Sequence, residues 1–320
     1  MTNLVTLAEI RDAAARIRGI ATHTPLVEVS CAGAGSPAAG ARLLLKCENL
    51  QATGAFKIRG AYNMIAQVPE DVRRRGVITY SSGNHGLALA CAARRLDVPA
   101  IIVMPTTAPP VKVDGTRRHG AEVIFEGTTI VHRRARAERE AATRQLTIVP
   151  PFDHAWIIAG QGTIGLEIMN QCPEVTTVYV QVGGGGLISG ISAAIKRVKP
   201  SVRIIGVEPA GAPKMSTSLR AGHPVTLDKV ETIADGLTTV RPGDITFPHV
   251  QALVDEIVQA GDAATIEAVR WLFREARLVV EPSGAVTVAA ARARGVTGTT
   301  VAVLSGGNVE PSAYARYLVG

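Results

Sequence analysis

Short apolar runs alternate with amphipathic helical patterns along the middle of the chain. The apolar runs cover residues 77–80, 100–104, 121–125 and 147–149, and apolar positions at helical spacing lie between them near 85–96, 110–119 and 130–145. Strands that are buried on both faces have continuous apolar runs, and their parallel pairing requires a crossover helix. The pattern therefore predicts a parallel sheet built from βαβ units.

A second series of elements surrounds this segment. Near the N-terminus, Thr6 and Glu9 have the spacing of a helix capping box, and residues 43–45 form the first buried strand. Beyond residue 152 the pattern predicts a helix near 162–171, a strand at 177–182, a helix ending near Lys199, a strand at 203–207, helices near 262–276 and 284–294, and a strand at 299–304. We expect an α/β protein with one lobe of residues 75–152 inserted into a larger lobe of residues 1–74 and 153–320. The cleft between two such lobes is the expected ligand site.

Composition and charge narrow the classes of function. The chain has 320 residues, of which 47% are hydrophobic and 4% aromatic, and a net charge of +7. Its basic residues are scattered among acidic ones, and few aromatic side chains could stack on bases, so we do not expect nucleic acid as a partner. The positive net charge is better explained by an affinity for small anionic ligands.

The chain has no recognisable targeting or membrane-spanning segment. Its N-terminus lacks a basic region followed by an apolar core, and no apolar run approaches the ~18–20 residues that span a bilayer. The four cysteines lack the spacing of a metal site, and several lie in apolar surroundings, as buried thiols do. We therefore expect a reducing, cytoplasmic location and no membrane partner.

Two loops with anion-binding character follow predicted strands. Four glycines, Gly183, Gly184, Gly185 and Gly186, precede a helix that begins near Leu187, where free N–H groups and the helix dipole favour a phosphate. No Walker lysine follows them, which argues against ATP hydrolysis. The second loop, which could hold a carboxylate and offers the amide of Asn84 as a donor, comprises Ser81, Ser82, Gly83, Asn84, His85 and Gly86.

Each candidate segment also has an ordinary structural interpretation. The glycines could be a flexible turn, Lys57 a surface lysine, His85 a structural histidine and Ser305 part of a glycine turn. Together, however, they supply an amine, a phosphate cradle, an amide donor and a hydroxyl at strand ends and helix starts. Pyridoxal phosphate requires such a set: a lysine to form a Schiff base, donors for its phosphate, and partners for its ring oxygen and nitrogen.

The sequence resembles the fold-type-II pyridoxal-phosphate enzymes of the serine/threonine dehydratase and serine racemase family along nearly its whole length. The matching stretches are residues 24–26, 48–61, 81–86, 159–163, 183–186, 207–209, 234–236, 281–285 and 305–308. The resemblance implies a two-lobed fold similar to that of the tryptophan synthase β chain, with a parallel-rich sheet flanked by helices in each lobe. It also implies that residues 75–152 form a small mobile domain and that the enzyme is a homodimer.

The resemblance implies a role for each matching residue. Lys57 forms the Schiff base and then acts as the base at the substrate Cα, Phe56 packs on the cofactor ring and Asn84 binds the ring hydroxyl. The phosphate is held by the N–H groups of Gly183, Gly184, Gly185, Gly186 and Leu187, and Ser305 faces the pyridine nitrogen. The residues expected around the substrate carboxylate are Ser81, Ser82, Gly83 and His85.

These roles imply an ammonia-lyase that converts L-threonine, L-serine or a related hydroxy-amino acid to a 2-oxo acid and ammonia. Ser82 leaves an alternative open, because a hydroxyl opposite Lys57 could return a proton to the other face of Cα and make the enzyme a serine racemase. Action on 3-hydroxyaspartate, as a dehydratase or a racemase, is a further alternative. The remaining hypothesis, a non-enzymatic protein that binds pyridoxal phosphate, requires the loss of a reacting group, and all of them are present.

One loop departs from the family pattern. Some relatives bind Mg²⁺ or Ca²⁺ through a Glu, a backbone carbonyl and an Asp; here Glu208 and Ala212 match the first two, and Lys214 occupies the Asp position. A hard cation requires oxygen ligands, and an ammonium group repels it. We therefore predict no metal site, with Lys214 beside Glu208 in the cation's place.

Overall fold

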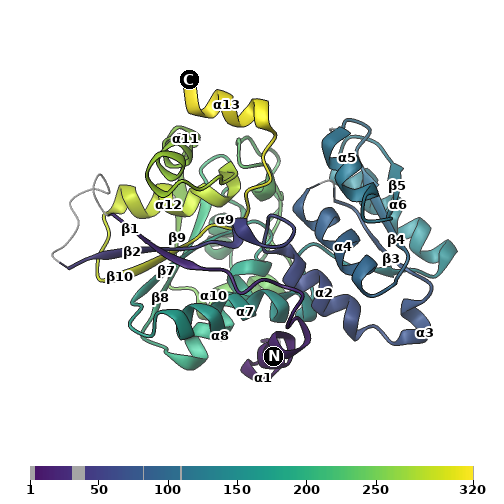
Figure 1. The fold of residues 1–320 in the computed structure, drawn as a ribbon, viewed down its shortest axis with the longest axis horizontal. Helices are drawn as coiled ribbons and strands as arrows, with labels where there is room; N and C mark the ends of the chain where they lie inside the picture. Colours follow the sequence, from purple (N-terminus) through teal and green to yellow (C-terminus); the bar gives the residue numbers. More distant parts are fainter. Residues whose placement is uncertain (1–3, 31–39, 82, 109, 320) are drawn as a thin grey trace.

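The computed structural model describes residues 4–30, 40–81, 83–108 and 110–319, which form two α/β lobes side by side (Figure 1). The larger lobe contains a six-stranded sheet in the order β1 (Leu26–Val29), β2 (Arg42–Lys46), β10 (Thr299–Val303), β7 (Thr177–Gln181), β8 (Arg203–Pro209) and β9 (Glu256–Ala260). The β1–β2 pair is antiparallel, and the other pairs are parallel.

Helices cover both faces of this sheet. One face packs against α7 (Ala155–Gln171), α8 (Gly186–Val198) and α10 (Thr246–Leu253), and the other against α11 (Asp262–Trp271), α12 (Pro282–Arg294) and α13 (Pro311–Val319). The N-terminal α1 (Leu7–Arg16) packs on α7 and α8, and its predicted capping box between Thr6 and Glu9 is confirmed. Covering a parallel sheet on both faces buries the continuous apolar strands that the sequence shows.

The smaller sheet has four strands, all parallel. Their order is β5 (Glu122–Phe125), β4 (Ala100–Met104), β3 (Val77–Thr79) and β6 (Thr147–Ile148). Its helices are α4 (Asn84–Arg95), α5 (Pro110–Arg117) and α6 (Ile130–Arg144). The prediction of parallel βαβ units in this segment is therefore confirmed.

Helix α2 (Lys57–Gln67) joins the two lobes. Its residues Ile58, Ala61, Met64 and Ile65 belong to one hydrophobic cluster with residues of α4, β3 and β4, while the helix also packs along α7 of the larger lobe. A short helix, α3 (Glu70–Arg73), follows and leads into β3. The domain boundaries that we predict at residues 74/75 and 152/153 stay predictions, because α2 contributes to packing on both sides.

Several elements differ from the sequence-based prediction. Helix α7 begins at Ala155 rather than near residue 162, because its residues 157–165 are buried on every side and lack the polar face that produces helical periodicity. Gly160 in this segment lies so close to α2 that a Cβ would approach Gly60 Cα to 2.6 Å. The prediction also missed the two edge strands of the larger sheet, β1 and β9, together with α9 (Lys214–Ala221), α10 and α13.

Three short segments complete the described elements: the 3₁₀ turns η1 (Glu48–Leu50) and η2 (Asp235–Leu237), and the π-helical turn η3 (Leu272–Ala276) that extends α11. None of the helices in the described ranges is long and apolar enough to cross a membrane.

Candidate active site

A cavity of about 480 Å³ lies where strands of both sheets end. The segments that follow the carboxyl ends of β3, β7 and β10 all contribute to its wall, as expected for ligand sites of parallel sheets. Its size is typical of sites for small molecules. Among its lining residues are the predicted Phe56, Lys57, Ser81, Gly83, Asn84, His85, Gly183, Gly184, Gly185, Gly186, Leu187 and Ser305.

Lys57 is the first residue of α2 and faces this cavity. Its Nζ donates a hydrogen bond to the carbonyl oxygen of Pro151 (2.6 Å) and lies 5.1 Å from the centroid of the Phe56 ring. The side chain is partly exposed to the cavity but surrounded by protein atoms, and this desolvation lowers its pKa to about 8. A fraction of the Lys57 side chains is therefore an uncharged, nucleophilic amine near neutral pH.

The glycine loop between β7 and α8 forms another part of the cavity wall. Gly185 has a φ of +104°, a conformation that L side chains rarely adopt. A Cβ at Gly184 would approach the Phe152 ring to 2.4 Å. The first N–H groups of α8 have no acceptor within the helix. Glycine thus keeps this helix N-terminus open to an anionic group.

A second helix N-terminus, that of α4, follows Ser81 and Gly83. His85 is buried in its first turn, and its Nε2 lies 3.0 Å from the carbonyl oxygen of Val149. Because a carbonyl oxygen can only accept, this contact requires the proton on Nε2 and leaves Nδ1 as an acceptor. Burial, with a contribution from Lys57, lowers the pKa of His85 to about 3, so the ring is neutral. Any anion at this end of the cavity is therefore bound by N–H groups of the first turn rather than by an imidazolium.

Asn84 connects α4 to two segments of the larger lobe. Its Nδ2 donates to Glu281 Oε1 (2.7 Å), and its Oδ1 accepts from Asn308 Nδ2 (2.9 Å). One of the two N–H groups of the Asn84 amide therefore remains for a further acceptor. Burial, reinforced by Asp235, raises the pKa of Glu281 to about 8. The carboxyl group that orients Asn84 is thus mostly protonated near neutral pH.

The lining also carries buried polar atoms with no partner in the described structure. These atoms are Gln161 Oε1, Gln181 Oε1, Thr239 Oγ1 and Arg133 Nε. Buried polar groups are normally hydrogen-bonded, and each exception requires an explanation. Four such atoms around one cavity indicate that a polar ligand completes it.

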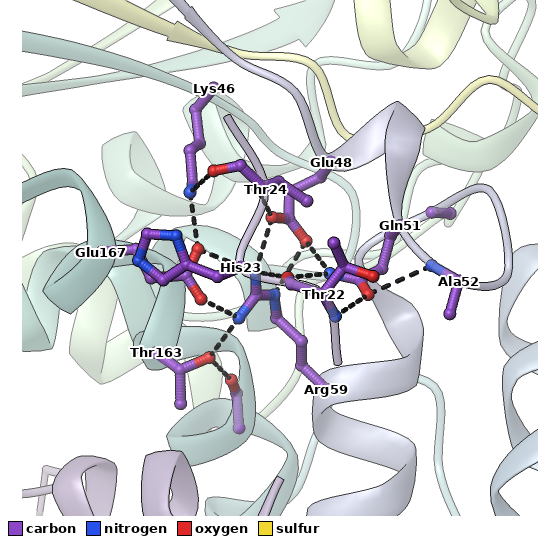
Figure 2. A network of polar contacts seen from close by, with 12 residues as sticks. Thr22, His23, Thr24, Lys46, Glu48, Gln51, Ala52, Arg59, Thr163 and Glu167 are labelled. Carbon is purple, nitrogen blue, oxygen red and sulfur yellow. Dashed lines mark hydrogen bonds and ion pairs between the residues drawn. The ribbon is translucent and has the colours of Figure 1, made fainter. Parts of the chain in front are cut away.

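Behind the cavity, a network of buried charges supports the start of α2 (Figure 2). Arg59 donates to both carboxylate oxygens of Glu48 (2.8 Å each) and to Glu167 (2.6 Å). Lys46 Nζ donates to Glu167 (2.5 Å) and to the carbonyl oxygen of Thr24 (2.7 Å). Burial disfavours the Glu48 carboxylate, but Arg59 holds its pKa below the usual value. This network fixes η1, α2 and α7 relative to one another, and therefore the direction in which Lys57 leaves α2.

Several residues that line the cavity have no role predicted from the sequence. Glu281, Asp235 and Asn308 lie within the matching motifs 281–285, 234–236 and 305–308, which was the signal that could have singled them out. Arg133 and Lys112 lie on α6 and α5 in an arginine- and lysine-containing region with no motif around them. Ser82, the predicted second catalytic residue, lies outside the described residues.

The loop that departs from the metal-binding pattern contains an ammonium group where a cation would lie. Lys214 Nζ is 3.5 Å from Glu208 Oε1, and both side chains are fully buried. The described residues contain no group of three or more His, Cys, Asp or Glu side chains that could hold a metal ion. The residues at this loop therefore do not fit Mg²⁺ or Ca²⁺.

Comparisons with known proteins agree with this geometry. The L-threonine ammonia-lyase of Thermotoga maritima is 43% identical over 317 residues, which cover 98% of this chain and 78% of that protein. The L-threo-3-hydroxyaspartate ammonia-lyase of a Pseudomonas species is 38% identical and matched over 98% of both chains. The structure of maize serine racemase superposes with a TM-score of 0.92 at 36% identity, covering 98% of this chain and 97% of that one. A family model described as pyridoxal-phosphate dependent enzyme matches residues 17–306. The chain therefore belongs to the family of pyridoxal-phosphate-dependent enzymes, and pyridoxal phosphate is its cofactor.

Proposed function

We propose that this enzyme is an ammonia-lyase that deaminates L-threonine, L-serine or a related hydroxy-amino acid to a 2-oxo acid. The observation that carries the proposal is the position of Lys57: a partly neutral amine faces one cavity together with two helix N-termini suited to two anionic groups. An amino-acid substrate and a phosphorylated cofactor together bring these two anions.

The lining residues fit pyridoxal phosphate. The N–H groups of residues 183–187 would hold its phosphate, since the open glycine loop at α8 leaves them unobstructed. Phe56 would pack against the ring, the free N–H of Asn84 would donate to the ring hydroxyl and Ser305 would face the ring nitrogen. Bound there, the cofactor supplies an electron sink that weakens the bonds of the substrate Cα.

The chain's own residues then bind the substrate and move its protons. The first turn of α4, with Ser81 and Gly83 before it, would bind the substrate carboxylate through N–H and hydroxyl donors. Lys57 would accept the Cα proton, a role that suits an amine whose pKa is about 8. Loss of the β-hydroxyl as water, followed by hydrolysis of the product, gives the 2-oxo acid and ammonia.

Arg133 favours a second candidate, 3-hydroxyaspartate. This arginine and Lys112 reach the cavity from the smaller lobe, and Arg133 Nε is buried with no partner in the described structure. A guanidinium group binds carboxylates with good geometry, so a substrate with a second carboxylate would satisfy it. L-threonine and L-serine carry no such group.

Serine racemisation is the other alternative, and it depends on Ser82. A proton donor on the face of Cα opposite Lys57 would allow the D-amino acid to form. The similarity in fold to maize serine racemase supports this alternative without distinguishing it from elimination.

The experiment that tests the proposal is a substrate panel. Purified enzyme would be incubated with L-threonine, L-serine, both 3-hydroxyaspartate diastereomers and the D-forms, with the 2-oxo acid and ammonia quantified and the recovered substrate analysed on a chiral column. Equal release of a 2-oxo acid and ammonia supports the lyase. Conversion to the other enantiomer without ammonia supports a racemase and contradicts the lyase as the main activity.

We further propose that residues 75–152 move as a small domain over the cavity and that the enzyme is a cytoplasmic homodimer. Residues 77–148 contain all four strands of the separate smaller sheet, and lining residues come from both lobes. Cys47, Cys91 and Cys172 are free and buried, as expected in a reducing compartment. The proposal of a dimer rests on the resemblance to the family, and measuring the molecular mass of the enzyme in solution tests it.

A further inference from the structure

The side chain of Lys214 lies at the point where three loops of the larger lobe meet. It is the first residue of α9, and its side chain is fully buried. Its Nζ donates to the carbonyl oxygens of Val182 (3.0 Å), Ala212 (3.1 Å) and Leu237 (3.1 Å). An ammonium group has three N–H donors, so three acceptors satisfy it completely.

A buried carboxylate balances the charge. Glu208 Oε1 lies 3.5 Å from Lys214 Nζ, and the same carboxylate accepts hydrogen bonds from Met215 N (2.7 Å), Ser216 N (2.9 Å) and Ser216 Oγ (2.7 Å). Glu208 thus caps the N-terminus of α9, where the helix dipole also favours a negative charge. Burial lowers the pKa of Lys214, and Glu208 opposes this shift. A neutral amine would leave one of the three carbonyl oxygens without a donor, so the geometry favours the ammonium form.

The ligand set around Lys214 Nζ, three backbone carbonyl oxygens and one carboxylate, has the chemistry of a site for a hard cation. We propose that the ammonium group of Lys214 occupies the place of a bound metal ion. The enzyme would therefore need no metal ion at this site. This assignment does not depend on which substrate the enzyme uses.

The carbonyl oxygens that Lys214 binds belong to segments that form the cavity. Val182 immediately precedes the glycine loop 183–186, and Leu237 ends η2, whose residues also line the cavity. Lys214 therefore connects the residue before the glycine loop to the Asp235–Leu237 turn and is not itself among the residues that line the cavity. Its role is that of a positioning residue for the loop that holds the cofactor phosphate.

The proposal predicts how the holoenzyme responds to cations. Thermal melting and the half-time of cofactor loss during dialysis would be measured in chelator and in millimolar CaCl₂ or MgCl₂. For the unaltered enzyme we expect both quantities to be unchanged within error. A clear loss of stability in chelator that Ca²⁺ or Mg²⁺ restores would overturn the proposal.

Two variants test the site itself. Lys214→Met leaves the Glu208 carboxylate and the three carbonyl oxygens without a cation, so we expect a melting temperature lower by roughly 5–15 °C and faster cofactor loss by about 10-fold or more. Lys214→Asp offers a second carboxylate in place of the ammonium, so we expect a similar loss in chelator that saturating Ca²⁺ or Mg²⁺ largely restores. Lys229→Asp, at an exposed lysine paired with Glu231, is the control for the change of charge.

The outcomes are distinct. Melting of Lys214→Met at the temperature of the unaltered enzyme, with unchanged cofactor retention, would show that the ammonium positions nothing. A folded Lys214→Asp that divalent cations fail to stabilise would overturn the assignment of a cation site. If Lys214→Asp does not fold, Lys214→Met and the cation response of the unaltered enzyme still decide the proposal.

Discussion

The Asn84 amide donates a 2.7 Å hydrogen bond to the buried carboxyl group of Glu281, 197 residues away in the sequence. Asn84 begins α4 beside the smaller sheet, and Glu281 precedes α12 of the larger lobe. The contact therefore joins the two lobes at the cavity. It also places the mostly protonated carboxyl group of Glu281 next to Asn84, which we expect to bind the ring hydroxyl of the cofactor.

Glu281→Gln tests the protonation of this group in cofactor-free enzyme. The pKa of Glu281 is raised from 4.5 to about 8, so between these values the folded protein holds a proton that the unfolded chain has lost. The contribution of Glu281 to the free energy of unfolding therefore falls as pH rises from about 4.5 to about 8. We expect Glu281→Gln to melt higher than the unaltered protein at pH 8, with the difference shrinking toward pH 5. The exposed Glu275→Gln is the control, and a difference that is constant with pH would contradict the assignment.

Arg133→Gln tests whether the substrate carries a second carboxylate. If Arg133 binds that group, the variant should lose about 10- to 100-fold in kcat/KM for 3-hydroxyaspartate and change little for L-serine and L-threonine. Arg134→Gln, at the exposed neighbour that pairs with Glu138, should leave all three values unchanged. A uniform loss across the substrates in Arg133→Gln would assign Arg133 to a structural role.

Ser82→Ala separates racemisation from elimination. Both reactions require Lys57 to remove the Cα proton, but only racemisation requires a donor on the opposite face. If Ser82 is that donor, the variant should lose D-serine formation by about 10²–10⁴-fold while 2-oxo acid release from L-serine persists. Equal loss of both activities would make Ser82 a carboxylate-binding residue, and a parent enzyme that forms no D-amino acid would remove the racemase alternative.

Arg59→Met tests the buried network behind α2. Removing Arg59 leaves Glu48 and Glu167 without their shared cation, so we expect a loss of about 3–5 kcal/mol in the free energy of unfolding. Arg74→Met breaks only the exposed pair with Glu70 and should cost less than ~0.5 kcal/mol. Thermal melting at pH 7 measures both. Similar melting temperatures for the two variants would show that the network does not stabilise α2.

The sequence predicted the interior strands of both sheets, but the edge strands of only one of them. The alternation of apolar runs located β3, β4, β7 and β10, since strands buried on both faces are apolar throughout. The partly exposed edge strands β1 and β9 of the larger sheet were missed, whereas the runs at 121–125 and 147–149 located β5 and β6 at the edges of the smaller sheet.

The residues of the candidate site also differ in whether the sequence alone identifies them. The glycine loop stood out because four consecutive glycines precede a helix, and Lys57 because it lies within the matching stretch 48–61. Glu281 and Arg133 did not, because their significance depends on burial and on contacts with residues far away in the sequence. Neither property follows from local sequence.

Chemical reduction of the holoenzyme identifies the lysine that carries the cofactor, which we expect to be Lys57. Purified enzyme would be reduced with borohydride, digested and analysed by mass spectrometry to locate the lysine to which the cofactor is now irreversibly joined. Lys112 lies in the same cavity and is the natural competitor. We predict that the adduct is on Lys57 and that Lys57→Ala forms none; an adduct on Lys112 or on any other lysine would show that Lys57 is not the Schiff-base lysine.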